Sequence, residues 1–218
     1  MASDSVVVDV LLDRYGRTFA AEAGIRVVDD TPSPLFRLLC MSLLTSARIS
    51  SDLALAATRA LADAGWTTPD AMLDSTWEDR TRVLNDAGYG RYDESTSRYL
   101  EDTTRLLVDR YSGDLRRVRE RADGDVEVAS RLLREFTGIG RLGASIFLRE
   151  VQVAWDEFQP FVDERALDQA GALSLPATAV GLRDLVDDGA GFARLVAALV
   201  RCGLDGAHDE IASAAAEG

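Results

Sequence analysis

The segment from Phe136 to Asp163, FTGIGRLGASIFLREVQVAWDEFQPFVD, constrains the fold of this chain more than any other. An apolar helix is predicted to end at Phe136, and a second one is predicted to begin near Arg141 or Leu142. Two glycines in the intervening turn, Thr137–Gly140, let the backbone turn tightly and approach a ligand. The pattern predicts a helix, a hairpin and a helix. The hairpin amides then lie at a helix N-terminus, which favours an anion such as phosphate.

The rest of the chain predicts an all-α protein, because no alternating strand pattern of useful length occurs. The apolar stripe Val7, Leu11, Tyr15 and Phe19 predicts one amphipathic helix over residues 6–21, with a packing role only. From Pro34, at the expected first helical position, apolar residues run nearly all round a helix. That helix is expected to be buried.

The net charge of −13 argues against a protein whose whole surface attracts nucleic acid. Residues 116–149, here called the arginine strip, nevertheless hold eight arginines and five acids. Taken alone, the strip is typical of a solvated face of mixed charge. Its overlap with the hairpin favours a surface that faces phosphates.

Other features of the composition indicate a soluble chain. Its apolar runs are shorter than the roughly 20 residues of a membrane span. No secretory signal opens the sequence, so we expect a cytoplasmic protein. Cys40 and Cys202 lack metal-site spacing and are expected to be buried thiols. His208, the only histidine, is expected at the surface, and no metal site is predicted.

The hairpin segment resembles the helix-hairpin-helix signature of the DNA glycosylase superfamily that includes endonuclease III. The hairpin is Gly138-Ile139-Gly140-Arg141, and Val162-Asp163 matches the aspartate motif, with Asp163 standing 23 residues after Gly140. The resemblance extends from about Pro34 to about Cys202. It implies a two-lobed helical DNA-glycosylase fold, in which residues 34–155 form a barrel-like domain containing the hairpin. Residues 1–33 and 156–218 would form the second lobe.

The resemblance also implies a site and a partner, duplex DNA. When bound to DNA, the protein would be associated with the nucleoid. Asp163 would be catalytic, although its position before a helix is by itself more typical of a structural N-cap. The residues expected to bind DNA, mainly through phosphates, are Gly138, Ile139, Gly140, Arg141 and Arg48. Tyr89 and Tyr92 could stack on a base, but aromatic residues at helix junctions more often belong to the core.

Three departures from the family limit what it implies. Bifunctional members form a Schiff base with a lysine just after the hairpin, but Leu142 stands there, and all 24 basic residues of this chain are arginine. The glutamine that often follows the first barrel helix is absent, and Arg48 could serve instead. Two cysteines cannot supply the four thiolates of an iron–sulfur cluster.

The prediction is therefore a monofunctional base-excision-repair glycosylase without an iron–sulfur cluster. A monovalent cation at the hairpin stays open. Two alternatives also stay open, namely a catalytically inactive DNA-binding relative and an acidic helical protein-interaction module.

Overall fold

The computed structural model describes residues 3–217, and within them every regular element is a helix, which confirms the all-α prediction. None of these helices combines the length and the apolar character needed to cross a bilayer. The elements are α1 (Asp4–Tyr15), α2 (Phe19–Glu22), η1 (Val27–Asp29), α3 (Pro32–Thr45), α4 (Ser51–Asp63), α5 (Pro69–Leu73), α6 (Trp77–Leu84), η2 (Asn85–Tyr89), α7 (Asp93–Tyr111), α8 (Arg116–Ala122), α9 (Val126–Leu133), α10 (Arg141–Val151), η3 (Asp156–Phe158), α11 (Glu164–Ala172), α12 (Ala179–Arg183), α13 (Gly189–Asp205) and α14 (His208–Glu217).

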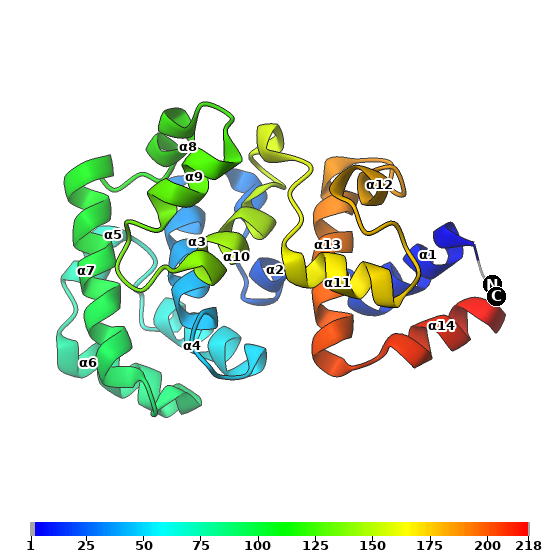
Figure 1. Ribbon diagram of the computed structural model, residues 1–218. Helices are drawn as coiled ribbons and strands as arrows, with labels where there is room; N and C mark the ends of the chain where they lie inside the picture. The colour runs from blue at the N-terminus through cyan, green and yellow to red at the C-terminus, as the bar shows by residue number, and fades with distance from the viewer. Residues whose placement is uncertain (1–2, 218) are drawn as a thin grey trace.

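The helices gather into two groups, which Figure 1 shows side by side. In the first group α3 packs against α4 and α10, α7 packs against α5 and α6, and α9 packs against α8 and α10. In the second group α13 packs against α1, α11 and α12, and α14 packs against α1. Helix α10 contacts both α3 and α13, so it is the element that the two groups share.

The single helix predicted over residues 6–21 is in fact two helices. α1 ends at Tyr15, and α2 begins at Phe19. A Cβ added to Gly16 would lie 2.2 Å from the carbonyl oxygen of Leu12, and the Thr18 hydroxyl accepts a hydrogen bond from the Ala21 amide at 3.2 Å. The N-cap Thr18, which lies between Tyr15 and Phe19 of the apolar stripe, starts a new helix. The prediction of one helix was wrong.

Two other helix ends differ from the predicted ones. α3 begins at Pro32, two residues before Pro34. Pro32 takes the first helical position that was expected for Pro34, and proline is favoured at that position. α9 ends at Leu133, so Phe136 lies in the turn rather than in the helix. The Phe136 side chain is still buried, and its ring stacks on Tyr111 with 5.7 Å between ring centroids. The prediction that the helix ends at Phe136 was therefore wrong, because the chain leaves the helix after Leu133.

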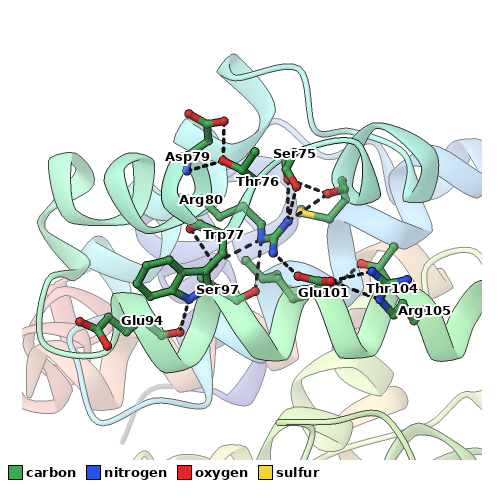
Figure 2. Close-up of polar contacts among 12 residues, drawn as sticks. Ser75, Thr76, Trp77, Asp79, Arg80, Glu94, Ser97, Glu101, Thr104 and Arg105 are labelled. Atoms are coloured by element: carbon green, nitrogen blue, oxygen red, sulfur yellow. Dashed lines mark hydrogen bonds and ion pairs between the residues drawn. The ribbon is translucent and has the colours of Figure 1, made fainter.

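A buried arginine ties α5, α6 and α7 together, as Figure 2 shows. The Arg80 side chain is 1% exposed. Its Nε donates to the Ser97 carbonyl oxygen at 3.2 Å, its Nη1 donates to the Ser75 carbonyl oxygen at 2.7 Å, and its Nη2 pairs with Glu101. One guanidinium thus satisfies acceptors from the end of α5 and from α7. It can do so only while α6 keeps its position.

We expect Arg80→Ala to lower the free energy of unfolding by about 3 kcal/mol, because it leaves the buried acceptors without a donor. Urea denaturation measures the change. Arg82→Ala is the matched control, because Arg82 lies on the same helix but is exposed and, in the part of the chain that the structure describes, pairs only with Asp79. Its cost should stay within about 0.5 kcal/mol. Equal losses in the two variants would contradict the role given to Arg80.

Candidate active site

The hairpin before α10 is held by its own backbone and by α7. Gly138 has φ +81°, a left-handed conformation that favours glycine, and a Cβ there would meet the Tyr99 ring at 3.1 Å. The Thr103 hydroxyl donates to the Thr137 carbonyl oxygen at 2.6 Å. Ile139 is buried, and α10 begins at Arg141, as predicted. The turn is therefore fixed in place before any ligand binds.

The hairpin amides are not equally available. The Ile139 amide donates to the Phe136 carbonyl oxygen at 3.0 Å, so its predicted contact with a phosphate is not supported. Within residues 3–217 no side chain caps the N-terminus of α10, and a Cβ added to Gly140 would meet nothing within 4 Å. The first amides of a helix have no intrahelical partner. Gly140 and Arg141 therefore present the donors that an anion could use.

A cavity of about 630 Å³ lies beside the hairpin, and we call it the central cavity. Its walls come from α10, α11, α13, Phe19 of α2 and the segment joining α3 to α4. They contain Phe19, Thr45, Ile49, Ser51, Arg141, Leu142, Ser145, Ile146, Arg149, Asp163, Glu164, Arg165, Asp168, Gln169, Val200 and Leu204. Six of these sixteen residues are apolar and ten are polar or charged, so the cavity offers both kinds of surface to a ligand.

Asp163 lies in this wall as the N-cap of α11, which begins at Glu164 as predicted. One carboxylate oxygen, Oδ1, accepts from the Ala166 amide at 2.9 Å. The other, Oδ2, accepts from Arg149 Nη1 at 2.7 Å. The Asp163 side chain is 10% exposed. It is thus both a structural cap and a group at the cavity surface.

Arg149 bridges two buried carboxylates. Its Nη1 pairs with Asp163, and its Nε lies 3.5 Å from Glu150 Oε1. Glu150 Oε2 accepts from the Ala20 amide in the first turn of α2 at 2.8 Å. We call Glu150, Arg149 and Asp163 the buried ionic row. It connects α2, α10 and α11, and each carboxylate also receives an amide from a helix N-terminus.

Phe19 forms the aromatic part of the cavity wall. The guanidinium carbons of Arg149 and Arg201 lie 5.1 Å and 4.0 Å from its ring centroid. Arg201 is held there by the Arg17 carbonyl oxygen at 2.9 Å and by Glu22 at 2.5 Å. The electron-rich face of this ring is therefore already engaged with cations.

Gln152 fixes the chain that leads to Asp163. Its side-chain amide donates to the Phe161 carbonyl oxygen at 3.0 Å and accepts from the Phe161 amide at 3.2 Å. The same Nε2 donates to the Arg149 carbonyl oxygen at 3.1 Å. Gln152 is fully buried, so these bonds are shielded from water. They hold residue 161 two positions before the carboxylate.

The structure brings together some of the predicted site residues. Arg141 and Leu142 line the central cavity with Asp163, and Leu142 is 45% exposed. Gly138, Ile139 and Gly140 form the adjoining hairpin. Arg48 is exposed between α3 and α4, next to the wall residue Ile49.

The two tyrosines proposed as a base pocket lie elsewhere. The Tyr89 hydroxyl donates to the Leu44 carbonyl oxygen at 2.9 Å, and burial raises the pKa of this phenol to about 12. Tyr92 packs edge-on against Tyr89 with 6.5 Å between centroids. Neither lines the central cavity. Their positions favour the alternative in which they belong to the core.

The arginine strip is partly neutralised by neighbouring acids. Arg116 pairs with Asp114 at 2.7 Å, and Arg119 pairs with Asp30 and Glu157 at 3.0 and 2.6 Å. Arg149 is buried in the ionic row. The exposed arginines of the strip that lie closest in sequence to the hairpin are Arg131, Arg134 and Arg141. The cationic surface is smaller than the sequence count suggested.

The thiols do not fit a four-cysteine cluster. Cys40 in α3 and Cys202 in α13 are both buried. Burial raises the pKa of Cys40 to about 12 and raises that of Cys202 as well, so both stay protonated at neutral pH. Within residues 3–217 no three His, Cys, Asp or Glu side chains are grouped to hold a metal. His208 is half-buried and contacts Gln169 Oε1 at 2.6 Å.

Sequence reasoning missed Phe19, Arg149, Gln152 and Glu150. Phe19 was assigned to packing alone, since its apolar spacing gives no sign of a cavity. The other three lie within an apolar helical run, where a charged or amide residue costs free energy unless it is paired. The available sign of a site was the presence of polar residues at the end of a buried helix, namely Arg149 and Glu150 in α10 and Gln152 at its C-cap.

Comparison with known proteins identifies the fold. No protein-family model matches the chain, and no curated protein matches it. An endonuclease III in a non-covalent complex with DNA superposes with a TM-score of 0.54 at 15% identity, covering 89% of this chain and 81% of that one. A trapped covalent endonuclease III–DNA intermediate, an estranged-adenine complex, gives 0.48 at 17% identity over 75% and 71%. The chain therefore has the helical fold of endonuclease III.

We expect Gln152→Met to release the segment before Asp163, because the Phe161 amide and carbonyl lose their partner. The free energy of unfolding should fall by about 2 kcal/mol. Hydrogen exchange should accelerate at the Phe161 amide and at the Ala166 amide, which Asp163 caps. The Ala144 amide, bonded to Gly140 within α10, is the internal control. Uniform acceleration at all three amides would indicate global destabilisation instead.

Proposed function

We propose that this chain is a monofunctional DNA N-glycosylase. The observation that carries the proposal is that Asp163, Arg141 and Leu142 line one cavity directly beside the hairpin. In this arrangement the hairpin holds the DNA backbone, and the cavity receives a nucleotide rotated out of the duplex. The endonuclease III fold supports the same assignment, since the similar structures are DNA complexes.

The hairpin supplies binding without sequence reading. The amides of Gly140 and Arg141 stand at the N-terminus of α10, where the helix dipole favours a phosphate. Contacts to phosphates set the register of a protein on DNA but carry no sequence information. Because the net charge is −13 and few arginines lie near the hairpin, we expect weak and strongly salt-dependent binding.

Asp163 is the group proposed to assist base release. As the bond between C1′ and the base nitrogen breaks, its electron pair leaves with the base, and the sugar becomes cationic. A carboxylate beside the sugar stabilises that cation and orients the attacking water. Leu142 carries no amine, and the chain has no lysine, so water is the nucleophile. The product is an intact abasic site.

The proposal requires no cofactor. The two cysteines of the chain cannot supply the four thiolates of an iron–sulfur cluster, and hydrolysis with a carboxylate and water needs no redox centre. A monovalent cation at the hairpin remains compatible with it. The barrel-like domain 34–155 and the lobe formed by 1–33 and 156–218 are proposed as the two walls of the DNA-binding cleft.

A second candidate, a non-catalytic DNA-binding protein, is favoured by one observation. Arg149 pairs with Asp163 at 2.7 Å, and a guanidinium at that distance offsets the carboxylate charge that would stabilise a sugar cation. Both candidates bind duplex DNA, and they differ in base release.

Gly140→Asp should weaken duplex binding at least 10-fold, because a carboxylate at the open hairpin would face a phosphate. Gly171→Asp is the matched control, since it adds the same charge at a glycine that also has open space. Fluorescence anisotropy at two salt concentrations measures both. Equal duplex affinity of the two variants would show that the hairpin is not part of the DNA interface.

Asp163→Asn should lower base release by about 100-fold or more while duplex affinity is retained, because the amide cannot stabilise a cation. The assay uses duplexes with single modified bases, read with and without alkali, and borohydride trapping. Strands should break only after alkali. A trapped covalent adduct would refute the monofunctional assignment, and full activity in the variant would refute the role of Asp163. Binding without release from any duplex would favour the non-catalytic candidate.

A further inference from the structure

We infer that Arg149 selects the class of base removed: a neutral base that leaves as an anion, rather than a cationic alkylated base. The inference rests on the proposed function and assigns a role to a residue that the reaction as proposed above does not use. It follows from three observations. Arg149 contacts Asp163, the guanidinium keeps a donor that is not hydrogen-bonded, and the Phe19 ring is already covered by two guanidinium groups.

The first observation is an oriented pair of opposite charges in the cavity wall. Arg149 and Asp163 both line the central cavity, and their side chains are 5% and 10% exposed. Their contact at 2.7 Å is buried, so it is screened little by salt. Glu150, which accepts a hydrogen bond from the Ala20 amide of α2, lies 3.5 Å from Nε on the other side of the guanidinium. A reacting nucleotide therefore meets a carboxylate and a cation side by side.

This pair of charges complements the departure of a neutral base. The bond between C1′ and nitrogen breaks, the electron pair goes to the base, and no net charge is created. The sugar becomes positive and the base negative, which matches Asp163 beside the sugar and Arg149 beside the base. Water then adds to C1′ and gives one proton to Asp163, from which solvent or the departed base takes it up. Fixed charges placed where charge develops are among the largest contributions to catalysis.

The guanidinium keeps donors for that role. Arginine carries five N–H donors, and within residues 3–217 only Nη1 donates to a carboxylate at hydrogen-bond distance. Nε also lacks a hydrogen-bond partner there, but it is buried and lies 3.5 Å from Glu150, so Nη2 is the donor that stays available to a ligand. A carbonyl oxygen on a departing base is the kind of acceptor that such donors recognise.

A cationic base is disfavoured by the same groups. Before release its positive charge would lie beside Arg149, which weakens its binding, and it leaves as a neutral molecule that Arg149 cannot stabilise as it stabilises an anion. Cationic bases are recognised by electron-rich rings. Within residues 3–217, Phe19 is the only aromatic residue in the wall, and two guanidinium groups already lie over it. The exposed residues of the wall carry equal numbers of positive and negative charges, namely Arg141 and Arg165 against Glu164 and Asp168. The preference for a neutral base therefore depends on the buried Arg149 and Asp163.

The test uses the whole chain and single-turnover base release. One set of duplexes carries the neutral bases uracil, 5-fluorouracil and 8-oxoguanine, and the other carries the cationic base 7-methylguanine. We expect release from at least one neutral base and none above background from 7-methylguanine. Faster release of 7-methylguanine than of every neutral base would overturn the inference and leave the glycosylase proposal standing. Release from no duplex would overturn both.

Arg149 variants test the residue itself. Arg149→Gln should slow uracil release about 100-fold and 5-fluorouracil release less, because the fluorinated anion needs less stabilisation. Arg149→Lys keeps the charge and should recover part of the rate. Equal losses on the two substrates in Arg149→Gln, with no recovery in Arg149→Lys, would reduce Arg149 to a packing role. Circular dichroism and duplex binding establish that each variant is folded, and the wild-type comparison decides the preference if Arg149→Gln does not fold.

Discussion

The structure of the site depends on the buried ionic row of Glu150, Arg149 and Asp163. Removing one guanidinium and two carboxylates from water costs several kcal/mol for each ion. The row is tolerated because every charge has a close partner: Arg149 lies between the two acids, and an amide at the start of α2 or α11 binds each carboxylate. Three segments far apart in the sequence are thereby set around one cavity wall. The position of the proposed catalytic carboxylate is an outcome of this charge compensation.

The parts of the fold that followed from the sequence are those encoded locally. A GxG turn at the end of an apolar run predicts a hairpin, and the start of α10 at Arg141 agrees. An aspartate after Pro160 predicts an N-cap, and Asp163 caps α11. The break at Gly16 was missed because the apolar stripe continues through it. The spacing of apolar side chains gives no sign of the N-cap at Thr18, where the second helix begins.

The parts of the site that could not be predicted depend on contacts between distant segments. Nothing near Gln152 indicates that its amide pairs with the backbone of Phe161, and nothing near Phe19 indicates that it faces Arg149 and Arg201. The partners of the arginine strip are equally distant, as the contact of Arg119 with Asp30 shows. A family signature locates the hairpin and the aspartate. The electrostatic surroundings of that aspartate come from contacts that the signature does not encode, and they bear on whether the site does chemistry or only binds DNA.

The two adjacent charges on α10 also restrict how such a sequence can diverge. Arg149 lines the central cavity, whereas Glu150 lines a separate cavity of about 780 Å³ formed with residues 16–28 and α13. Loss of Arg149 alone leaves Glu150 and Asp163 as two buried acids without their cation, whereas loss of Glu150 leaves Arg149 still paired with Asp163. The two positions are therefore not equally free to change. Descendants of this sequence should replace Glu150 more readily than Arg149, so that charge compensation sets the order in which the two substitutions occur.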